Sequence, residues 1–410
     1  MAMVLRLFAV FGPLAVIGKE CHDFDAQCCH INPAVDPHYE DFKGNASHMV
    51  PEWGVVDLAL PPAERWATLA AEAAPAMRTM IAHFKSFVGL LSSEIFKLME
   101  DSEKFKKIAE RVLDEMGEYG LEMRGIANAT GIPSEEVLFL NMMYEIEGGC
   151  TSIVAQDENG HVFHGRNLDF GLFFGEDWRR LQWTLTEDLR PLLRNVHFVE
   201  GHVPLYSSTI FLGYVGTLTA VKKGAFSVTV NTRYDSSHWA SLLAFLEGKG
   251  SGNFLSLTLR DMMVQNSSYA EALKTIQTAP LLGPAYVIVG GAKSGEGAVI
   301  ERSANGIAGQ RLLADVASKG VNSLVQTNWD FGKDPFFDNR RSPAEHCLTE
   351  RFNTNITFPG LFSVLSARPN RNRLTTYTAL MSAETGDLEA YLQFCKELEC
   401  APWMTATVMV

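Results

Sequence analysis

The chain has 410 residues, 47% of them hydrophobic, and its 48 acidic residues outnumber 35 basic ones to give a formal net charge of -13. This is the composition of an ordinary globular protein with enough chain for a large core. The acidic balance disfavours nucleic acid as a partner, because phosphate backbones bind basic surfaces.

Residues 1–18 are predicted to be a secretory signal peptide. One basic residue, Arg6, precedes an apolar run over 7–17, and the small residue Gly18 ends the segment. The run is too short to span a bilayer of about 30 Å, and no later stretch reaches the roughly 20 apolar residues of a spanning helix. We therefore expect a lumenal mature chain that begins at residue 19.

Four Asn-X-Ser/Thr sequons agree with that compartment. They predict N-glycosylation at Asn45, Asn128, Asn266 and Asn355. A chain of this length contains a few sequons by chance, so the signal peptide is what gives them weight.

The N-terminal part of the mature chain is predicted to be mainly helical. Between 61 and 116, apolar residues from Trp66 to Leu91 recur every three or four positions, with charges between them. A second short helix is expected over 135–144, with Ser134 as its N-cap.

The pattern changes at Gly148-Gly149-Cys150, after which strand-like runs dominate. Strands are predicted at 151–156, 161–167, 182–186, 209–212, 226–231, 286–291, 298–302 and 375–381, and helices at 239–246, 254–265 and 269–278. An α+β fold, in which helices pack against antiparallel sheet, fits this mixture best.

The two runs that flank Asn159-Gly160 predict a β-hairpin that begins with Cys150. A two-residue turn would place Cys150 opposite Asp169, and a four-residue loop would place it opposite Asn167. Either register brings Arg166 and Asp169 within a residue or two of the sulfur.

Cys150 is predicted to be a nucleophile that the chain unmasks by cutting itself. A thiol attacks as its thiolate, which a neighbouring guanidinium such as Arg166 favours. Asp169 can orient an α-amino group, which exists at Cys150 only after the Gly149–Cys150 bond is broken; one residue then supplies both nucleophile and base. Gly148-Gly149 suits such a cut, because glycine tolerates a strained backbone.

The alternative interpretation of Cys150 is a buried strand cysteine beside a structural Arg–Asp pair. Three features favour the nucleophile instead. The chain has seven cysteines, so at least one thiol stays outside intramolecular disulfides. Two glycines precede Cys150, and the second strand of the predicted hairpin brings Arg166 and Asp169 beside it.

The stretch from Cys150 to Gly171 resembles the start of the catalytic subunit in the family of acid ceramidase and N-acylethanolamine-hydrolysing acid amidase. The same family is resembled at Leu-Pro-Pro-Ala-Glu-Arg-Trp (60–66), Gly-Tyr-Val-Gly (213–216), Pro-Ala-Tyr (284–286), Gly-Gly (290–291), Val-Gln-Thr-Asn-Trp-Asp (325–330) and Arg-Arg-Ser-Pro-Ala (340–344). The resemblance implies an N-terminal nucleophile fold, in which two antiparallel sheets lie between helices. It also implies a cut into a helical α subunit, 19–149, and a catalytic β subunit, 150–410.

The resemblance also assigns catalytic roles. It makes Cys150 the nucleophile, Arg166 and Asp169 its polarising and orienting neighbours, Asn328 the oxyanion donor and Arg340 a supporting residue. An amide nitrogen aimed at a developing oxyanion is a donor such a site needs. Without the resemblance, Asn328 is interpreted as a turn residue and Arg340 as a solvated cation.

Three further residues are expected near the substrate. Asn231 is predicted to line the site. Leu168 and Phe170 have two equally favoured interpretations, as core residues or as part of the wall that contacts the substrate. Relatives typically have Asn-Glu-Arg where this chain has Asn231-Thr232-Arg233, so no acidic residue is available there for self-cleavage.

The resemblance implies a disulfide pattern as well. Cys395 is expected to pair with Cys400, and Cys347 with one of Cys21, Cys28 or Cys29, which would link the α and β subunits and leave Cys150 free.

The C-terminal end, 391–403, resembles that of the ceramidases. The implied activity is hydrolysis of ceramide to sphingosine and a fatty acid, in the lysosome and also after secretion, without cofactor or metal. Implied partners are a ceramide-like N-acyl lipid, a saposin-like activator and the surface of the lysosomal membrane. The rival hypotheses are an N-acylethanolamine acid amidase and an inactive lipid-binding glycoprotein, in which Thr232 and Gly148-Gly149 mark lost processing.

Overall fold

The computed structural model describes residues 50–91, 101–143, 148–171, 176–177, 182–233, 238–250, 252–304, 306–335 and 338–395. The predicted signal peptide, Asn45 and four of the cysteines (Cys21, Cys28, Cys29 and Cys400) lie outside these residues. Within them, no helix combines the length and the apolar character needed to cross a membrane.

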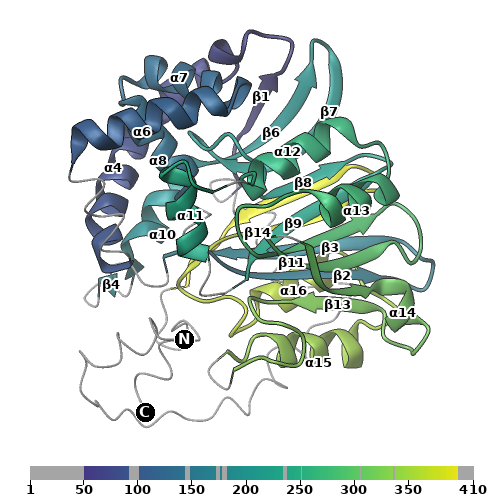
Figure 1. The fold of residues 1–410 in the computed structure, drawn as a ribbon. Coiled ribbons are helices and arrows are strands. Elements are labelled where there is room, and N and C mark those ends of the chain that lie inside the picture. Colours follow the sequence, from purple (N-terminus) through teal and green to yellow (C-terminus); the bar gives the residue numbers. More distant parts are fainter. Residues whose placement is uncertain are drawn as a thin grey trace, which may run out of the picture.

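Two sheets packed face to face form the centre of the molecule (Figure 1). The larger has eight strands in the order β1-β6-β7-β8-β9-β10-β11-β12, and the smaller has five in the order β13-β2-β3-β14-β15. The strands of the larger sheet are β1 Trp53–Asp57, β6 Leu193–Glu200, β7 Val203–Phe211, β8 Thr219–Lys222, β9 Phe226–Thr232, β10 Ala285–Gly291, β11 Gly297–Ser303 and β12 Gly306–Leu312. Those of the smaller sheet are β13 Ser323–Gln326, β2 Gly149–Gln156, β3 Val162–Asp169, β14 Thr375–Ser382 and β15 Asp387–Leu392.

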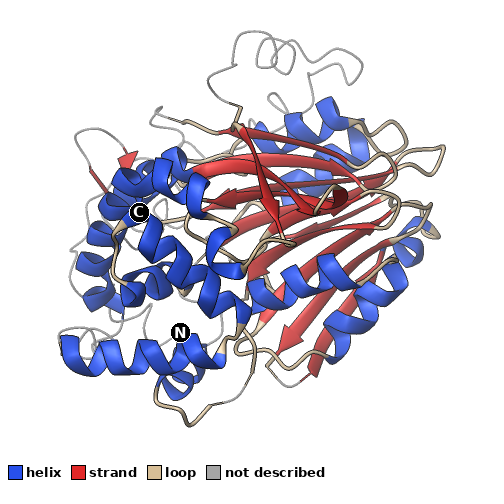
Figure 2. Ribbon diagram, turned by 90° about the horizontal axis from the view of Figure 1, so that it is seen from above, coloured by secondary structure: helices blue, strands red, loops and turns tan. Residues whose placement is uncertain are grey.

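Helices cover the outer faces of both sheets (Figure 2). The five-stranded sheet packs against α15 (Arg341–Arg351) and α16 (Phe358–Ser366), and the eight-stranded sheet packs against α12 (Leu255–Gln265) and α13 (Tyr269–Thr278). Two further short helices, α11 (His238–Leu246) and α14 (Leu313–Ala317), also lie in the part of the chain after Cys150. The expected α+β sandwich is confirmed, with one departure from the all-antiparallel expectation, because β1 pairs with β6 in parallel.

The helical N-terminal part consists of α4 (Ala67–Leu91), α6 (Ser102–Glu115), α7 (Glu118–Thr130) and α8 (Ser134–Asn141). It is preceded by β1 and the short helix η2 (Pro62–Glu64). The predicted cap of α8 is wrong, since Pro133 occupies the N-cap position. The hydroxyl of Ser134 instead donates a hydrogen bond to Glu110 at 3.1 Å.

The strand predicted over 182–186 is also wrong. Only Gln182–Trp183 (β5) is extended, paired with β4 (Glu176–Asp177), and the chain then forms helix α10 (Thr184–Leu189) and a short turn of helix, η3 (Arg190–Leu192). Leu185 and Leu189 stand four residues apart and are both fully buried, which is the spacing of an apolar helix face.

The hairpin forms, but in neither predicted register. Cys150 lies opposite Leu168, and Gly149 lies opposite Asp169. The turn is wider than two residues because the Asp157 side chain accepts hydrogen bonds from the amides of Asn159 (3.0 Å) and His161 (2.8 Å). Gly160 follows with a φ of +85°, a conformation that favours glycine.

Candidate active site

Cys150 lies at the start of β2 with its side chain fully buried. Directly paired residues in a sheet share a face, so the Cys150–Leu168 and Ser152–Arg166 pairs put Arg166 on the same face as the sulfur. A guanidinium nitrogen of Arg166, Nη2, donates a hydrogen bond to Cys150 Sγ at 2.6 Å. The predicted neighbour is therefore in contact with the nucleophile, where its positive charge interacts better with a thiolate than with a thiol.

Arg166 is itself held from the eight-stranded sheet. Its Nη1 donates to the carbonyl of Leu218 at 2.9 Å and to the hydroxyl of Thr219 at 3.0 Å. The Thr219 hydroxyl is also hydrogen-bonded to the Tyr377 hydroxyl at 2.7 Å. These contacts fix the direction from which the cation approaches the sulfur.

Asp169 and Arg340, both of which the family resemblance assigns to the site, meet behind Cys150. Both side chains are buried, and Arg340 Nη1 lies 3.3 Å from Asp169 Oδ2 and 3.1 Å from the backbone oxygen of Cys150. Asn372 donates to the same Asp169 oxygen at 3.3 Å. The other oxygen, Oδ1, has no hydrogen-bond partner among the described residues. Burial raises the pKa of Asp169, and the positive charge of Arg340 acts in the opposite direction.

Asn328 links these groups to the bond that is expected to be cut. Its Oδ1 accepts hydrogen bonds from the Cys150 amide at 3.0 Å and from Arg340 Nη2 at 2.8 Å. Its Nδ2 donates to the carbonyl of Gly148 at 3.1 Å and to that of Thr232 at 2.8 Å. Asn328 and Arg340 thus contact both sides of the Gly149–Cys150 bond. Arg340 is buried, so it is not the solvated cation of the alternative interpretation, and Asn328, which that interpretation made a turn residue, is buried as well.

Two residues of this site were missed from the sequence. Asp338 binds Arg340 with both carboxylate oxygens, at 2.9 Å from Nε and 2.8 Å from Nη2, and Asn372 holds Asp169. Asp338 stands two residues before Arg340, and this proximity is the one sequence signal that could have indicated it as an ion-pair partner of Arg340. Asn372 reaches the site from a loop far along the chain, and no local pattern indicates it.

Three other predicted residues differ in their surroundings, and of these only Leu168 lies directly opposite Cys150. Asn167 points to the opposite face of β3, where it donates to the carbonyls of Leu365 (2.7 Å) and Asn370 (3.1 Å). Leu168 and Phe170 are buried within the main hydrophobic core. Their contact with a substrate stays a prediction.

Asn231 is fully buried between the two sheets. Its Nδ2 donates to the carbonyls of Gln326 (2.8 Å) and Thr327 (3.1 Å), just before Asn328 in the chain. Its Oδ1 accepts from the Ser152 hydroxyl at 2.7 Å. The adjacent Thr232 hydroxyl is buried and has no hydrogen-bond partner among the described residues.

A buried histidine continues this chain of hydrogen bonds. The Ser152 hydroxyl accepts from that of Thr229 at 2.9 Å, so Thr229 must accept from Nε2 of His164, also at 2.9 Å. Each hydroxyl has one proton to give, which places the proton of a neutral His164 on Nε2. Nδ1 then accepts from Ser227 at 2.9 Å, in preference to the 3.2 Å contact of Ser227 with the carbonyl of Gly290.

His164 is expected to make the fold less stable in acid. Burial, aided by the charge of Arg166, lowers its pKa from 6.5 to about 3. The unfolded chain therefore takes up a proton below pH 6.5 and the folded chain does not, which costs on the order of 2 kcal/mol at pH 5. Urea unfolding of His164→Gln in a Cys150→Ala background should show a pH 7 to pH 5 loss smaller by about that amount.

The control for this prediction is His161→Gln. His161 is exposed and its pKa is raised by Glu384, so its removal acts on the pH dependence in the opposite direction. If the free energy of unfolding falls by the same amount between pH 7 and pH 5 in His164→Gln and in the parent protein, the assignment of a neutral, buried His164 is contradicted.

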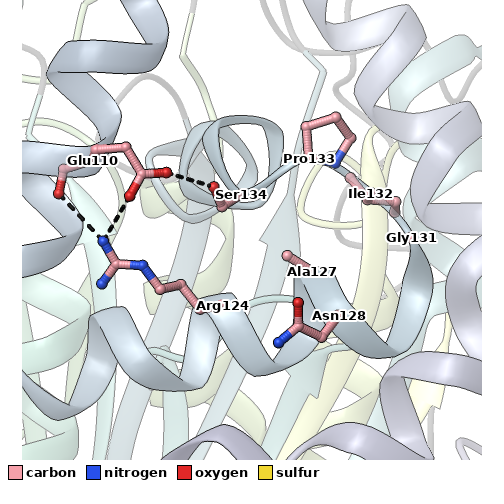
Figure 3. A pocket seen from close by; sticks show the side chains of 8 residues that line it. All are labelled: Glu110, Arg124, Ala127, Asn128, Gly131, Ile132, Pro133 and Ser134. Carbon is pink, nitrogen blue, oxygen red and sulfur yellow. Dashed lines mark hydrogen bonds and ion pairs between the residues drawn. The ribbon is translucent and has the colours of Figure 1, made fainter.

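A pocket lies away from this site, in the helical N-terminal part (Figure 3). Its walls include the Glu110–Arg124 ion pair, with nitrogen and oxygen 2.8 Å apart. They also include Asn128, which is exposed, as is Asn355, whereas Asn266 is half-buried. Asn128 and Asn355 are therefore accessible to the expected glycans.

The disulfide bonding of the described cysteines agrees with the prediction that Cys150 stays outside disulfides. The Cys150 thiol is in no disulfide, while Cys347 and Cys395 are disulfide-bonded. The partners predicted for those two residues lie outside the described residues, so the pairing itself stays a prediction.

The match to one known family begins at Cys150. A model for linear amide C–N hydrolases of the choloylglycine hydrolase family matches residues 150–316. A second model, described as the beta subunit of N-acylethanolamine-hydrolyzing acid amidase, matches residues 50–105.

Individual proteins show similarity over most of the chain. Acid ceramidases from Mus musculus and Homo sapiens are each 36% identical over 359 residues, which cover 86% of this chain and 88% of theirs. Among solved structures, the N-acylethanolamine-hydrolyzing acid amidase ortholog of Caenorhabditis elegans matches with a TM-score of 0.50 and 31% identity, over 60% of this chain and 100% of its own. Together with the two sheets between helices, these similarities confirm the expected N-terminal nucleophile hydrolase fold.

Proposed function

Because this chain belongs to the acid ceramidase family, we propose that it hydrolyses the amide bond of ceramide to sphingosine and a free fatty acid. The observation that supports this function best is the 2.6 Å contact of Arg166 with Cys150 Sγ, buried beside Asp169, Asn328 and Arg340. A cation on the sulfur and an amide donor nearby are what thiol attack on an amide carbonyl requires.

The first step is cleavage of the chain before Cys150. The thiolate attacks the carbonyl carbon of Gly149, the C–N bond to Cys150 breaks, and the Cys150 nitrogen takes up a proton. Water then hydrolyses the resulting thioester, which frees the thiol and leaves a carboxylate on Gly149. The products are a helical subunit, 19–149, and a catalytic subunit, 150–410, that carries a new α-amine.

Cleavage frees the groups that a substrate needs. Before the cut, Asn328 Nδ2 donates to the carbonyl of Gly148 at 3.1 Å. When the residues before Cys150 withdraw, that N–H is available for the oxyanion of a bound amide. Asp169 Oδ1, which has no hydrogen-bond partner among the described residues, can accept a hydrogen bond from the new α-ammonium of Cys150.

Turnover repeats the chemistry on ceramide. The thiolate attacks the amide carbonyl, the C–N bond breaks, and the α-amine passes a proton to the leaving sphingosine nitrogen. A fatty-acyl thioester forms on Cys150. Water, deprotonated by the same amine, releases the fatty acid.

The second candidate substrate is an N-acylethanolamine. It is favoured by the 31% identity to the acid amidase ortholog and by the amidase model that matches residues 50–105. Both substrates are fatty-acyl amides, and they differ in the size of the amine that leaves.

A direct comparison of the two amides tests the proposal. Processed protein should hydrolyse ceramide with a kcat/KM at least about tenfold above that for an N-acylethanolamine of the same acyl chain. Faster release of ethanolamine would overturn the ceramide assignment. A protein that binds ceramide but is never cut and hydrolyses neither amide would support the inactive lipid-binding glycoprotein.

The cellular setting belongs to the same proposal. We place the enzyme in the lysosome and, after secretion, outside the cell, with glycans at Asn128 and Asn355 among its predicted sites. Cys347 is disulfide-bonded, and a bridge to the N-terminal part would keep the two subunits covalently joined. A saposin-like activator and contact with membrane lipid would deliver ceramide to the buried thiol.

A further inference from the structure

The segment 213–219 joins β7 to β8 and includes Gly-Tyr-Val-Gly, a motif to which the proposed chemistry gives no role. Gly213 has a φ of +93°, and a Cβ added there would lie 2.5 Å from Met77 Cε and 2.8 Å from Leu140 Cδ2. Met77 and Leu140 belong to α4 and α8. This stretch of the catalytic part is therefore packed directly against the helical part, and only glycine fits.

Asn141, at the end of α8, fastens the segment to the helical part with reciprocal hydrogen bonds. Its Nδ2 donates to the carbonyl of Gly213 at 2.8 Å, and its Oδ1 accepts from the amide of Val215, also at 2.8 Å. A third bond, from Nδ2 to the carbonyl of Val137 at 2.9 Å, fixes the Asn141 side chain on its own helix. Asn141 is buried, so these bonds are shielded from water.

A buried ion pair supports the same segment from a second direction. Arg260 of α12 donates to the carbonyl of Val215 at 2.9 Å and to Glu122 of α7 at 2.8 Å. Glu122 is fully buried and also accepts from Trp66 at 2.6 Å and from Arg65 at 2.8 Å. Residues of the helical part thus hold Val215 both directly and through Arg260.

The C-terminal end of segment 213–219 contacts Arg166, the cation that binds the Cys150 sulfur. The carbonyl of Leu218 and the hydroxyl of Thr219 accept hydrogen bonds from Arg166 Nη1, and the other terminal nitrogen of Arg166, Nη2, donates to Cys150 Sγ. These acceptors follow Val215 and Gly213 by three to six positions in the chain. A shift of the segment would therefore move Arg166 relative to the sulfur.

We propose that Asn141 is a positioning residue for Cys150, which acts from the helical part through segment 213–219 and Arg166. The inference rests on the proposed function, because it assigns the helical part a role in the reaction of Cys150 after the chain has been cut. A misplacement of about 1 Å in such a site can cost about a hundredfold in rate.

The test compares processed Asn141→Ala with wild type in two measurements. With ceramide, kcat should fall by about tenfold or more while KM changes by less than about twofold, since the displaced group acts on the reacting sulfur. The pH profile of Cys150 alkylation by iodoacetamide should move to higher pH, as expected when a cation withdraws from a thiolate. A purely structural defect would lower the amount of processed enzyme without moving that profile.

The matched control is Tyr119→Phe. It removes a hydrogen bond from the helical part to Asp261 at 2.5 Å, across the same interface, but leaves segment 213–219 untouched. We expect its kcat and its alkylation profile to match wild type. In an Arg166→Lys background, Asn141→Ala should add less than about a twofold loss, because both changes act on one interaction.

Should Asn141→Ala yield no folded protein, Asn141→Asp replaces it, because Asp keeps the acceptor for Val215 while it loses the donor to Gly213. The proposal is overturned if the Asn141 variant behaves like Tyr119→Phe, or if its loss is fully additive with Arg166→Lys. Should wild type hydrolyse no amide, the alkylation profile still decides the role of Asn141. Failure of the proposed function is therefore distinguishable from failure of this inference.

Discussion

The Cys150→Ala protein is expected to remain a single chain and to lose ceramide hydrolysis by at least roughly four orders of magnitude, the scale seen when a catalytic nucleophile is removed. The change removes both the attacking sulfur of self-cleavage and the nucleophile of turnover. The fold should survive, because the buried site loses one sulfur atom and Arg166 loses one acceptor, a cost of about 1–3 kcal/mol.

Intact mass and N-terminal sequencing measure this directly, after the secreted protein has been incubated at mildly acidic pH. Wild type should show a new N-terminus at Cys150, and Cys150→Ala should not. Cys150→Ser is the matched variant, since its hydroxyl preserves the shape and can attack, but more slowly. A Cys150→Ala chain that is cut before residue 150 would show that another protease performs the maturation.

The nucleophile and its nearest partners could be predicted because they lie on one hairpin. Cys150, Arg166 and Asp169 are separated by fewer than twenty residues, and any pairing across the turn brings them together. The register itself could not be predicted, because the Asp157 side chain widens the turn by bonding the amides of Asn159 and His161. That one-residue difference decides which side chains share the face of the sulfur.

The rest of the site depends on contacts between distant segments. Asn328, Arg340 and Asn231 were predicted through the family resemblance alone, since an asparagine before Trp329 or an arginine pair has no local pattern that implies burial. Their hydrogen bonds form only when β13, α15 and β9 come together around β2. Asn372, which no resemblance indicated, was missed for the same reason.

Errors in the predicted elements have a related cause. The strand expected at 182–186 became a helix because Leu185 and Leu189 pack together toward the core, where α10 also contacts α4. The edge strand β12 contains no fully buried residue, so it lacks the apolar run that indicates a buried strand. Tertiary packing therefore determined these elements more than local propensity did.

The Arg340→Met protein is expected to be both unstable and uncut, because Arg340 joins the expected cleavage site to two carboxylates. Its buried guanidinium contacts Asp338, Asp169, Asn328 and the Cys150 carbonyl. Its removal leaves buried charges unpaired, which typically costs about 3–5 kcal/mol in the free energy of unfolding. Denaturant unfolding in a Cys150→Ala background measures that cost without interference from cleavage.

Arg340→Lys separates the charge of this residue from its geometry. Lysine keeps a cation near Asp338 and Asp169, so we expect it to recover part of the stability lost in Arg340→Met. It cannot reproduce the fork that holds Asn328 and the Cys150 carbonyl at once, so self-cleavage should slow by about a hundredfold, the cost of a lost oxyanion-type donor. The time course of the new Cys150 N-terminus measures that rate. Cleavage of Arg340→Lys at the wild-type rate would mean that Arg340 acts as a buried counter-charge alone, and that Asn328 is held in place by Gly148 and Thr232.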